Sequence, residues 1–414
     1  MPTIVHTDVL VLGGGSAGVA SAVAAAGEGL DITLIERNAF PGGKATAAEV
    51  GTVCGLYKFS KAEGSSYIVK GFAKQFAEAL RTASGTAPLH NSNGLHYLPY
   101  DIGVFKSNAL NLLQQNKIKA YFNSIPCKVN MTDHRIDSIL VAHPDKDIQF
   151  NFKSIIDCSG ESIISQLTDS PVIKSENYQA AAQVFSLMDV EEENEDRLGM
   201  ILMKELKSAI DNKVLDDYFD RVYIVQGSLK NKCVSLKLGL PLPVTLTAEN
   251  REALKKMGQS FAALLTAHLV QHVPVFKHAS IKHLAPEVGI RVGFRTEGNY
   301  ILTEEDVLQC RKFDDAIANA AWPVEIWEQD KRVIMRYFDY DDFYQVPAGC
   351  LQSVYFNNLF MAGRNISADD GAIASARVMG ICLQTGYAAG LLAAGHAKHL
   401  PVKETIKKIQ FAQL

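Results

Sequence analysis

A glycine-rich turn between two apolar stretches near the N-terminus constrains the fold more than any other part of this sequence. The apolar run Val9–Leu12 is typical of a strand that is buried on both faces. Three glycines in the spacing G-x-G-x-x-G come next, at positions Gly13, Gly15 and Gly18. The small residues of 16–29 predict a helix, and the apolar run 32–36 predicts a second strand, which ends in Glu36. This order predicts a βαβ unit and therefore an α/β fold with a doubly wound, Rossmann-like parallel sheet.

The residue types in this turn are those that hold a dinucleotide. Gly13 permits the tight turn, Gly15 lets the backbone approach a pyrophosphate, and Gly18 removes a side chain where the helix crosses the strand. The start of the helix presents free N–H groups and a partial positive charge to the phosphates. Glu36 stands where a carboxylate accepts hydrogen bonds from a ribose diol, which disfavours a 2′-phosphate. The sequence therefore favours a dinucleotide site over a purely structural glycine turn.

Composition narrows the class of protein. The chain has 414 residues, more than one hydrophobic core usually serves, so we expect two domains. The net charge is −4 and there is no long basic run, which argues against nucleic acid as a partner. The seven cysteines are scattered without a C-x-x-C pair, so we expect reduced thiols in a cytoplasmic protein and no metal site. No window of about 18 apolar residues predicts a membrane-spanning helix.

A second glycine pair, Gly42–Gly43, follows the acid and distinguishes between two dinucleotides. A nicotinamide dehydrogenase would continue here into another crossover helix, whereas a flavin cofactor needs an extra loop beside its ribityl chain. Residues 154–160 predict a strand that ends in a glycine, and 358–395 predict a strand, a glycine turn and a small-residue helix. The start of that helix, near 378–380, would face the flavin pyrimidine and stabilise negative charge on it.

Five short motifs occur in order through nearly the whole chain. They are GGGSAG at 13–18, GGKAT at 42–46, IDCSG at 156–160, NLFMAGR at 358–364 and ARVMG at 376–380. In these motifs the sequence resembles the FAD flavoproteins of the glutathione-reductase type and, more narrowly, the FAD-dependent oxidoreductases, relatives of tRNA-uridine-modifying and fumarate-reductase-like flavoproteins. Where the family pattern has a His-Glu pair, this chain has Asp370 and Gly371. The resemblance implies FAD as the cofactor.

We expect the residues that contact FAD to lie in the glycine turns, beside the acid and at the start of the last long helix. They are Gly13, Gly15, Ser16, Ala17, Gly18, Glu36, Arg37, Gly43, Lys44, Ala45, Thr46, Val129, Ser159, Gly160, Gly363, Arg364, Arg377, Val378 and Met379. Val129 is expected to contact the adenine through its backbone.

The motifs divide the chain into two interleaved domains. We expect a discontinuous FAD-binding domain with a β-hairpin insert, an α+β substrate or cap domain, and a C-terminal helix or tail. The ranges are 1–60, 105–170 and 345–400 for the first, 61–104 and 171–344 for the second, and 401–414 for the last. In the cap, the 3.6-residue apolar period of 248–273 predicts a long helix. Thr303 and Asp306 predict a capping box that starts a helix running towards Trp322.

Four side chains are candidates for the chemistry. Arg291 and Arg295 could hold a substrate carboxylate or face the flavin, and the structural alternative is a buried ion pair between domains. Asp370 stands before the flavin-facing helix, where it could serve as a base or as a helix cap. Tyr344 could donate a hydrogen bond to the substrate.

Other chemistry-bearing residues favour structural roles. His90 and His96 lie in a loop expected to face the cavity and could act as bases, although exposed loop histidines are commoner. The pair at 268 and 272 has zinc-ligand spacing without a third ligand, which favours packed or surface histidines. Cys54 lies near the flavin loop and is expected to be a buried thiol.

Together these features predict an FAD-dependent oxidase or dehydrogenase. Hydride would pass from a small organic substrate to flavin N5, and oxygen or an electron carrier would reoxidise the flavin. The alternatives are a monooxygenase or reductase that uses transiently bound NAD(P)H, a tRNA-modifying flavoprotein, and a non-catalytic FAD-binding scaffold. The sequence leaves open the substrate, the electron acceptor, covalent attachment of FAD and assembly into a homodimer.

Overall fold

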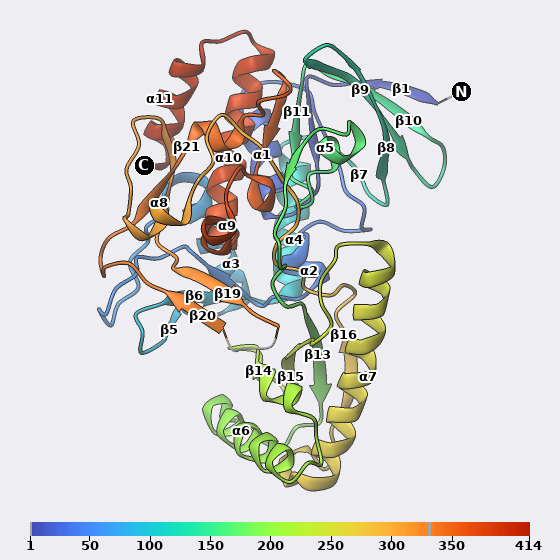
Figure 1. Cartoon of the computed structure of the whole chain (residues 1–414), viewed down its shortest axis with the longest axis vertical. Coiled ribbons are helices and arrows are strands. Elements are labelled where there is room, and N and C mark those ends of the chain that lie inside the picture. The colour runs from blue at the N-terminus through green and yellow to red at the C-terminus, as the bar shows by residue number, and fades with distance from the viewer. Residues whose placement is uncertain (1, 330–332) are drawn as a thin grey trace.

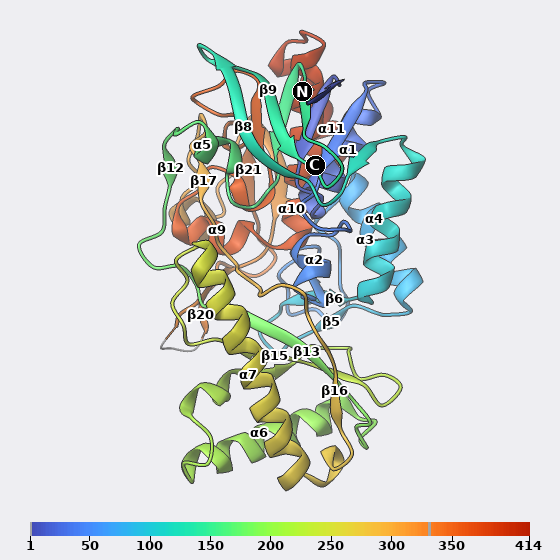
Figure 2. The same cartoon turned by 90° about the vertical axis from the view of Figure 1, so that its right-hand side faces the viewer.

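Two lobes of unequal size make up the computed structural model, which describes residues 2–329 and 333–414 (Figures 1 and 2). The larger lobe holds both termini, a parallel sheet and most of the helices. The smaller lobe, at the bottom of Figure 1, is built from the helices α6 (Glu195–Asp211) and α7 (Ala248–His272) and a small sheet that packs against them. Each lobe has its own hydrophobic core.

A five-stranded parallel sheet is the centre of the larger lobe, with the order β22-β11-β2-β3-β7. Its strands are β2 (Val9–Leu12), β3 (Ile32–Ile35), β7 (Lys119–Tyr121), β11 (Ser154–Asp157) and β22 (Leu359–Met361). All neighbouring pairs in this sheet run parallel. The three central strands are fully buried, as their largely apolar sequences predict, although β3 contains Thr33 and β11 contains Ser154 and Asp157. The βαβ unit predicted from the glycine turn is therefore confirmed.

Two small-residue helices, α1 (Ser16–Ala26) and α10 (Met379–Ala397), pack against each other over this sheet. Glycines let their backbones approach closely: a Cβ added at Gly386 would lie 2.2 Å from the carbonyl oxygen of Ala17. The Ser21 hydroxyl donates a hydrogen bond across the contact to the Gly386 carbonyl, at 2.8 Å. This close contact fixes the position of the first turn of α1, which follows the glycine turn.

The hairpin insert forms a second sheet beside the parallel one, in the order β1-β10-β9-β8. Its strands are β1 (Thr3–His6), β8 (Ile125–Thr132), β9 (Arg135–Ala142) and β10 (Ile148–Asn151). β8, β9 and β10 pair antiparallel, as expected for a hairpin region, while β1 runs parallel to β10.

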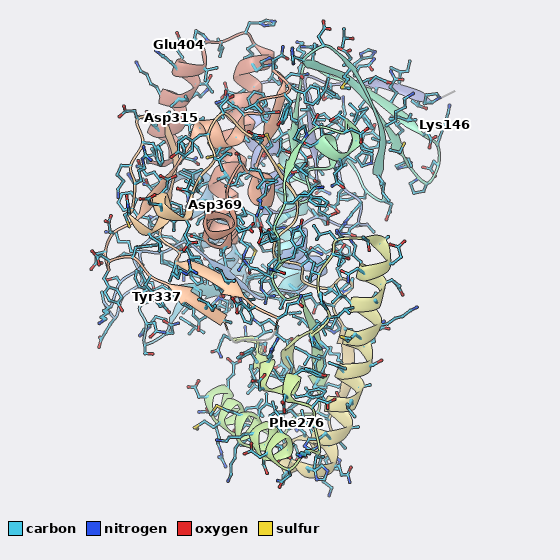
Figure 3. All side chains as sticks on the ribbon, viewed as in Figure 1. Lys146, Phe276, Asp315, Tyr337, Asp369 and Glu404 are labelled. Carbon is cyan, nitrogen blue, oxygen red and sulfur yellow. The ribbon has the colours of Figure 1, made fainter. Side chains whose placement is uncertain are left out.

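The smaller lobe is a four-stranded sheet, in the order β14-β15-β13-β16, with two helices. Its elements are β13 (Ala182–Met188), α6 (Glu195–Asp211), η1 (Asp217–Arg221), β14 (Val222–Ile224), β15 (Val234–Gly239), α7 (Ala248–His272), η2 (Pro274–Phe276) and β16 (Ser280–Leu284). Phe276, labelled in Figure 3, lies in its core. The long helix expected over 248–273 is confirmed as α7.

The packing differs from the expected division of the chain. Among the described residues, the fully buried core of the smaller lobe lies within 181–290, and the partly buried Tyr178 and Phe294 pack against it. Segment 61–104, expected in the cap, instead packs into the larger lobe through Phe72 and Phe76 on its helix α3 (Gly71–Ser84). Residues 292–344 also contribute to the larger core, Trp322 among them. Apolar positions predict that a segment is buried, but they do not say in which of two cores.

The remaining elements surround the sheet of the larger lobe. They are α2 (Lys44–Ala47), β4 (Thr52–Cys54), β5 (Leu89–His90), β6 (His96–Pro99), α4 (Ile102–Gln115), α5 (Ile163–Leu167), β12 (Val172–Ile173), β17 (Arg295–Thr296), α8 (Glu304–Leu308), β18 (Ala316–Ala320), β19 (Val324–Trp327), β20 (Val333–Arg336), β21 (Tyr344–Pro347), η3 (Ala348–Leu351), η4 (Gly363–Asn365), α9 (Asp370–Ala376) and α11 (Val402–Gln413). Helix α11 accounts for the expected C-terminal helix.

The capping box of Thr303 and Asp306 is confirmed, with both reciprocal hydrogen bonds present. The helix that it starts does not run towards Trp322, and this expectation was wrong. Helix α8 ends at Leu308, and Cys310 adopts a left-handed conformation with φ of 51°, which no helix can continue through. The chain then enters β18, which pairs with β21.

Across residues 2–329 and 333–414, no single helix is both long and apolar enough to cross a membrane. The pair α9 and α10 passes that test of length and composition only when taken together, and the two helices meet at 95°. Nearly all residues of both helices are buried inside the protein.

Candidate functional site

A cavity of about 460 Å³ lies where the carboxyl ends of the parallel strands face the smaller lobe. Residues directly after β2, β3, β11 and β22 line one wall, because parallel strands end at the same edge of a sheet. Residues of β13 and β15 in the smaller lobe line the opposite wall. A single cavity is therefore shared by both lobes.

Most of the residues expected to contact the cofactor line this cavity. Those that do are Gly13, Gly15, Ser16, Ala17, Glu36, Arg37, Gly43, Lys44, Ala45, Ser159, Gly160, Gly363, Arg364, Arg377, Val378 and Met379. Gly18 and Thr46 stand behind the wall, where Gly18 leaves room for the Gly13 carbonyl. Val129 also lies outside the lining and packs against the hairpin core, whereas Ser124–Pro126, just before it, line the cavity. The expected contact of Val129 with the adenine therefore finds no support in the cavity lining.

The first turns of two helices open on the cavity without a side-chain cap. Gly15 is the N-cap of α1 and Val378 that of α10, and neither provides a capping hydrogen bond from a side chain. Neither helix has an acidic residue in its first turn. Both helix starts line the cavity. Their N–H groups and partial positive charge are therefore directed at whatever occupies the cavity.

Glu36 stands at the end of β3 as a buried carboxylate on the cavity wall. It accepts hydrogen bonds from the backbone N–H groups of Gly14, at 2.6 Å, and Asn38, at 2.8 Å. Burial raises the pKa of its carboxyl, although both N–H groups act in the opposite direction. The carboxylate thus ties the glycine turn to the end of the second strand.

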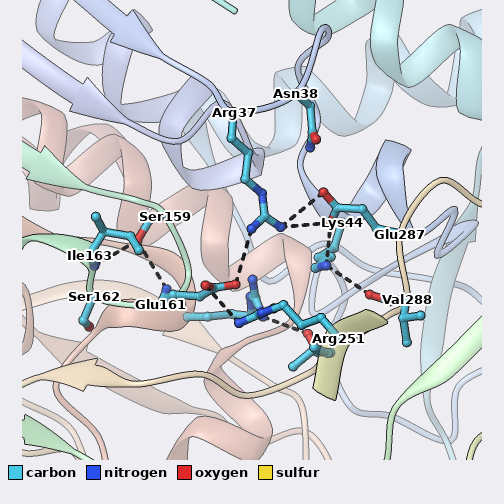
Figure 4. A network of polar contacts seen from close by, with 12 residues as sticks. Arg37, Asn38, Lys44, Ser159, Glu161, Ser162, Ile163, Arg251, Glu287 and Val288 are labelled. Carbon is cyan, nitrogen blue, oxygen red and sulfur yellow. Dashed lines mark hydrogen bonds and ion pairs between the residues drawn. The ribbon is translucent and has the colours of Figure 1, made fainter. Parts of the chain in front are cut away.

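A network of ion pairs joins the two lobes across the cavity (Figure 4). Glu287, which follows β16, pairs with Lys44 at 2.6 Å and with Arg37 at 3.0 Å. Arg251 of helix α7 pairs with Glu161 at 3.0 Å. Burial lowers the pKa of Lys44 to about 8. Although burial also opposes the charge on Glu287, Lys44 and Arg37 lower the pKa of that carboxyl to about 2.

The turn after β11 is fixed by the buried carboxylate of Asp157. Its Oδ1 accepts from the backbone N–H of Ser159 at 3.0 Å and from the Asn365 amide at 2.5 Å, and its Oδ2 accepts from Ile164 at 3.0 Å. Burial raises the pKa of Asp157, against these hydrogen bonds. This arrangement holds the Ser159–Gly160 turn at the cavity wall and links it to the segment after β22.

The other end of the cavity is rich in cations. Arg291 and Lys237 both lie over the ring of Trp327, 4.1 Å and 4.6 Å from its centre. Arg377 donates a hydrogen bond to the Glu325 carbonyl at 3.1 Å, and its Nη2 lies 3.9 Å from the Glu325 carboxylate. Burial lowers the pKa of Lys237 to about 8 and that of Arg291 to about 9.

Of the four predicted catalytic residues, Arg291 alone lines the cavity. Arg295 is fully buried and forms an ion pair with Asp370, at 2.7 Å. The Asp370 side chain is half exposed and both residues belong to the larger lobe, so this pair matches the expected ion pair but not its expected place between domains. The Tyr344 hydroxyl is buried against that of Ser375, at 2.6 Å. The prediction that Arg295, Asp370 and Tyr344 face the reacting groups is therefore corrected, because none of them lines the cavity. The position of a residue near a motif did not determine the direction of its side chain. Asp369, labelled in Figure 3, caps α9 through the Ala372 N–H at 2.7 Å.

The histidines expected near the cavity do not line it. His96 is held between the Ser65 hydroxyl, at 2.7 Å, and the Ser60 carbonyl, at 2.9 Å. His268 contacts Glu205 at 2.8 Å, which fits the packed histidine favoured above. Cys54 does line the cavity, and burial raises the pKa of its thiol to about 12, so it is a neutral thiol there.

Sequence reasoning missed the residues that the smaller lobe and the β19 strand bring to the cavity. These are Lys237, Glu287, Glu325 and Trp327, and Glu161, which follows β11 in the larger lobe, was missed as well. They stand in no recognisable motif, and their proximity depends on how the lobes pack. The single signal in the sequence was the position of Glu287 just before the segment that holds Arg291.

Comparisons with known proteins agree with this arrangement. A family model described as "FAD dependent oxidoreductase" matches residues 8–414. No curated protein matches the chain. The fold is shared with OxyS anhydrotetracycline hydroxylase from Streptomyces rimosus, with 11% identity, a TM-score of 0.51, and coverage of 98% of this chain and 65% of that one.

Two further solved structures are similar at lower TM-scores. A geranylgeranyl bacteriochlorophyll reductase-like protein from Thermoplasma acidophilum is 12% identical with a TM-score of 0.45, and 99% of this chain and 83% of that chain are covered. A flavoprotein/dehydrogenase from Cytophaga hutchinsonii is 12% identical with a TM-score of 0.47, and 99% of this chain and 84% of that chain are covered. The family model supports the broader family of FAD-dependent oxidoreductases and not specifically the glutathione-reductase type.

Proposed function

Because the chain belongs to the family of FAD-dependent oxidoreductases, with FAD as cofactor, we propose that it oxidises a small organic substrate by hydride transfer to flavin N5. The observation that carries this proposal is the shared cavity. The start of α10 and the strands β13 and β15 of the smaller lobe line one continuous space. A substrate held against the smaller lobe would therefore face a cofactor held against the larger lobe.

The residues on the cavity wall fit FAD. The uncapped start of α1 suits a pyrophosphate, because its N–H groups have no competing acceptor from an N-cap side chain. The buried Glu36 carboxylate, together with the segment Ser124–Pro126, suits the adenosine. The uncapped start of α10 suits the flavin pyrimidine, where negative charge develops on reduction. We propose this assignment of the three parts of the cofactor.

When bound, FAD supplies the capacity to accept and return two electrons as a hydride. The chain itself supplies position, charge and exclusion of water. Val378 and Met379, at the start of α10, direct the positive end of a helix dipole at the flavin site. Val184 and Trp327 bring apolar surface to the facing wall, which keeps water away from a reacting C–H bond.

Anaerobic reduction of the purified holoenzyme tests the proposed reaction. We expect the absorbance of the oxidised flavin to bleach on mixing with members of a panel of small alcohols, amines and hydroxy acids, in the absence of NAD(P)H. Bleaching by NADH or NADPH alone, with no response to the panel, would replace the proposal with the monooxygenase or reductase reading. Flavin that stays oxidised with every donor would favour the alternative of a non-catalytic FAD-binding scaffold.

A side chain added to the cavity wall at Gly15 tests the position assigned to the pyrophosphate. Gly15 has φ of −71°, and a Cβ there meets one atom within 4 Å, the Gly43 Cα at 3.7 Å, so the fold tolerates a side chain. Gly15→Val should therefore purify folded and without flavin. Gly27→Ala, at the other end of α1 with φ of −61°, is the matched control and should keep its flavin. Stoichiometric flavin in Gly15→Val would refute the assignment.

A further inference from the structure

Three basic side chains from three different segments meet at one end of the cavity, beside Trp327, and one carboxylate accompanies them. The bases are Arg291, Lys237 on β15 and Arg377, and the acid is Glu325 on β19. All four line the cavity. Although burial opposes its ionisation, Arg377 lowers the pKa of the Glu325 carboxyl, so it is ionised at neutral pH. The cluster therefore holds an excess of positive charge.

One carboxylate cannot balance the charge of three bases, although Glu325 lies 3.9 Å from the Arg377 guanidinium. The Glu325 carboxylate is already engaged by both indole N–H groups, at 3.1 Å from Trp322 and 2.9 Å from Trp327. Within residues 2–329 and 333–414, the Lys237 ammonium makes no hydrogen bond or ion pair, and it lies over the rings of Tyr223 and Trp327. In the same part of the chain, the Arg291 side chain makes one hydrogen bond, from Nη1 to the Ala180 carbonyl.

Such a cluster is costly without an anion. Burying a cation away from water costs several kcal/mol unless a counter-charge or hydrogen bonds compensate it. Lys237 and Arg291 both protonate above neutral pH, so near pH 7 both carry charge in the cavity. The Nε of Arg377 is likewise buried without a hydrogen-bond partner in the described residues. An anionic group seated here would remove these costs.

We propose that this end of the cavity binds the carboxylate of a small organic substrate, held by Arg291 and Lys237 beside Trp327. The inference rests on the proposed function, since it names the substrate class of that reaction. Arg377 stands directly before α10 and so serves the cofactor side, which leaves Arg291 and Lys237 for the substrate. The planar guanidinium fork of Arg291 matches a carboxylate, and Val184 and Ala182 provide an apolar wall for the rest of the molecule.

Equilibrium binding to the oxidised holoenzyme tests this without turnover. The probes are acetate, phenylacetate, benzoate and succinate, each paired with its neutral amide, and inorganic phosphate. The readouts are the difference spectrum of the bound flavin and the shift of the thermal unfolding midpoint. We expect at least one carboxylate to bind tenfold or more tightly than its amide and more tightly than phosphate. Equal binding of every acid and amide, or a preference for phosphate, would overturn the proposal.

Two variants and two controls assign the anion site. Arg291→Gln and Lys237→Gln should each weaken carboxylate binding about tenfold or more, with little change for the amide. Lys282→Gln and Arg197→Gln, at exposed positions in the smaller lobe, should bind like the wild type. Lys237→Arg, which keeps the charge, should recover much of the affinity. Flavin content reports that each variant is folded. Unchanged carboxylate affinity in both glutamine variants would refute the assignment.

The outcome separates this inference from the function on which it rests. Flavin reduced by members of the donor panel, with no preference for carboxylates over amides, would refute the anion site alone. Carboxylate-specific binding by a holoenzyme that no donor reduces would refute the proposed reaction alone.

Discussion

Replacing Gly386 with alanine should disturb the cofactor site by separating the helices α1 and α10, which pack against each other behind the cavity wall. Gly386 lies on α10, opposite the first turn of α1, and its missing side chain is what allows the two helices to touch. A Cβ at this position would lie 2.2 Å from the Ala17 carbonyl oxygen and 2.7 Å from the Ala17 Cα. Both atoms belong to backbone, so no flexible side chain can give way. The helices must separate.

The size of the effect follows from that distance. Contacts of a Cβ below 3.0 Å are essentially absent from proteins, so the helices must part by roughly 1 Å in a densely packed interior. Overpacking of this kind costs about 1–3 kcal/mol. The same movement shifts Ser16 and Ala17, which line the cavity, away from their place. A loss of about 1.4 kcal/mol in flavin binding corresponds to a dissociation constant about tenfold higher.

Flavin titration of the apoprotein, followed by quenching of flavin fluorescence, measures this change, and thermal unfolding measures stability. Gly386→Ala should show the weaker binding and a lower unfolding midpoint. Gly27→Ala is the control, because a Cβ there meets only carbonyl oxygens at 3.4 Å and 3.5 Å. Should Gly386→Ala bind flavin and unfold like Gly27→Ala, the helix contact would not position the cofactor wall, and the reasoning would fail.

Three further predictions concern charged groups. Glu36→Ala leaves the Gly14 and Asn38 N–H groups without their acceptor, so flavin titration should show binding weaker by about 1–3 kcal/mol. The pKa of Glu287 lies at about 2, below the ordinary 4.5, so its ionised carboxylate contributes fully to the free energy of unfolding above pH 4.5. The thermal unfolding midpoints of the wild type and of Glu287→Gln should therefore converge as the pH falls from 4.5 towards 2. The Lys237 ammonium faces Arg291, Arg377, Glu325 and Cys54 and has a pKa of about 8, whereas the pKa of Arg291 is about 9. Carboxylate binding, measured by flavin difference spectra, should therefore already weaken between pH 7 and 8 in the wild type but stay level over that interval in Lys237→Gln.

The local part of the fold could be predicted from the sequence because its signals are local. The glycine turn, the buried strands and the capping box of Thr303 each depend on residues within a few positions of one another. The same holds for most of the cavity wall in the larger lobe, since residues that follow parallel strands meet at one edge.

What could not be predicted depends on long-range packing. Lys237 and Trp327 reach the cavity because the smaller lobe and the β19 strand fold back against the sheet, and nothing near either residue encodes this. Arg291 and Arg295 are separated by three residues, yet Arg291 lines the cavity whereas Arg295 is buried and forms an ion pair with Asp370. Spacing in an irregular segment does not determine the direction of a side chain. The expected boundary of the cap domain differs from the packing because apolar positions do not say which of two cores a segment joins.

The strand order of the parallel sheet also determines when the site can exist during synthesis. Strands β22, β11 and β2 are adjacent in space, yet they come from residues 359–361, 154–157 and 9–12. A nascent chain that has grown only to residue 300 already carries the whole contiguous core of the smaller lobe, but it lacks one edge strand and helix α10. Synthesis must therefore pass helix α10 before this cavity wall is complete, and until then the apolar face of α1 needs protection from aggregation.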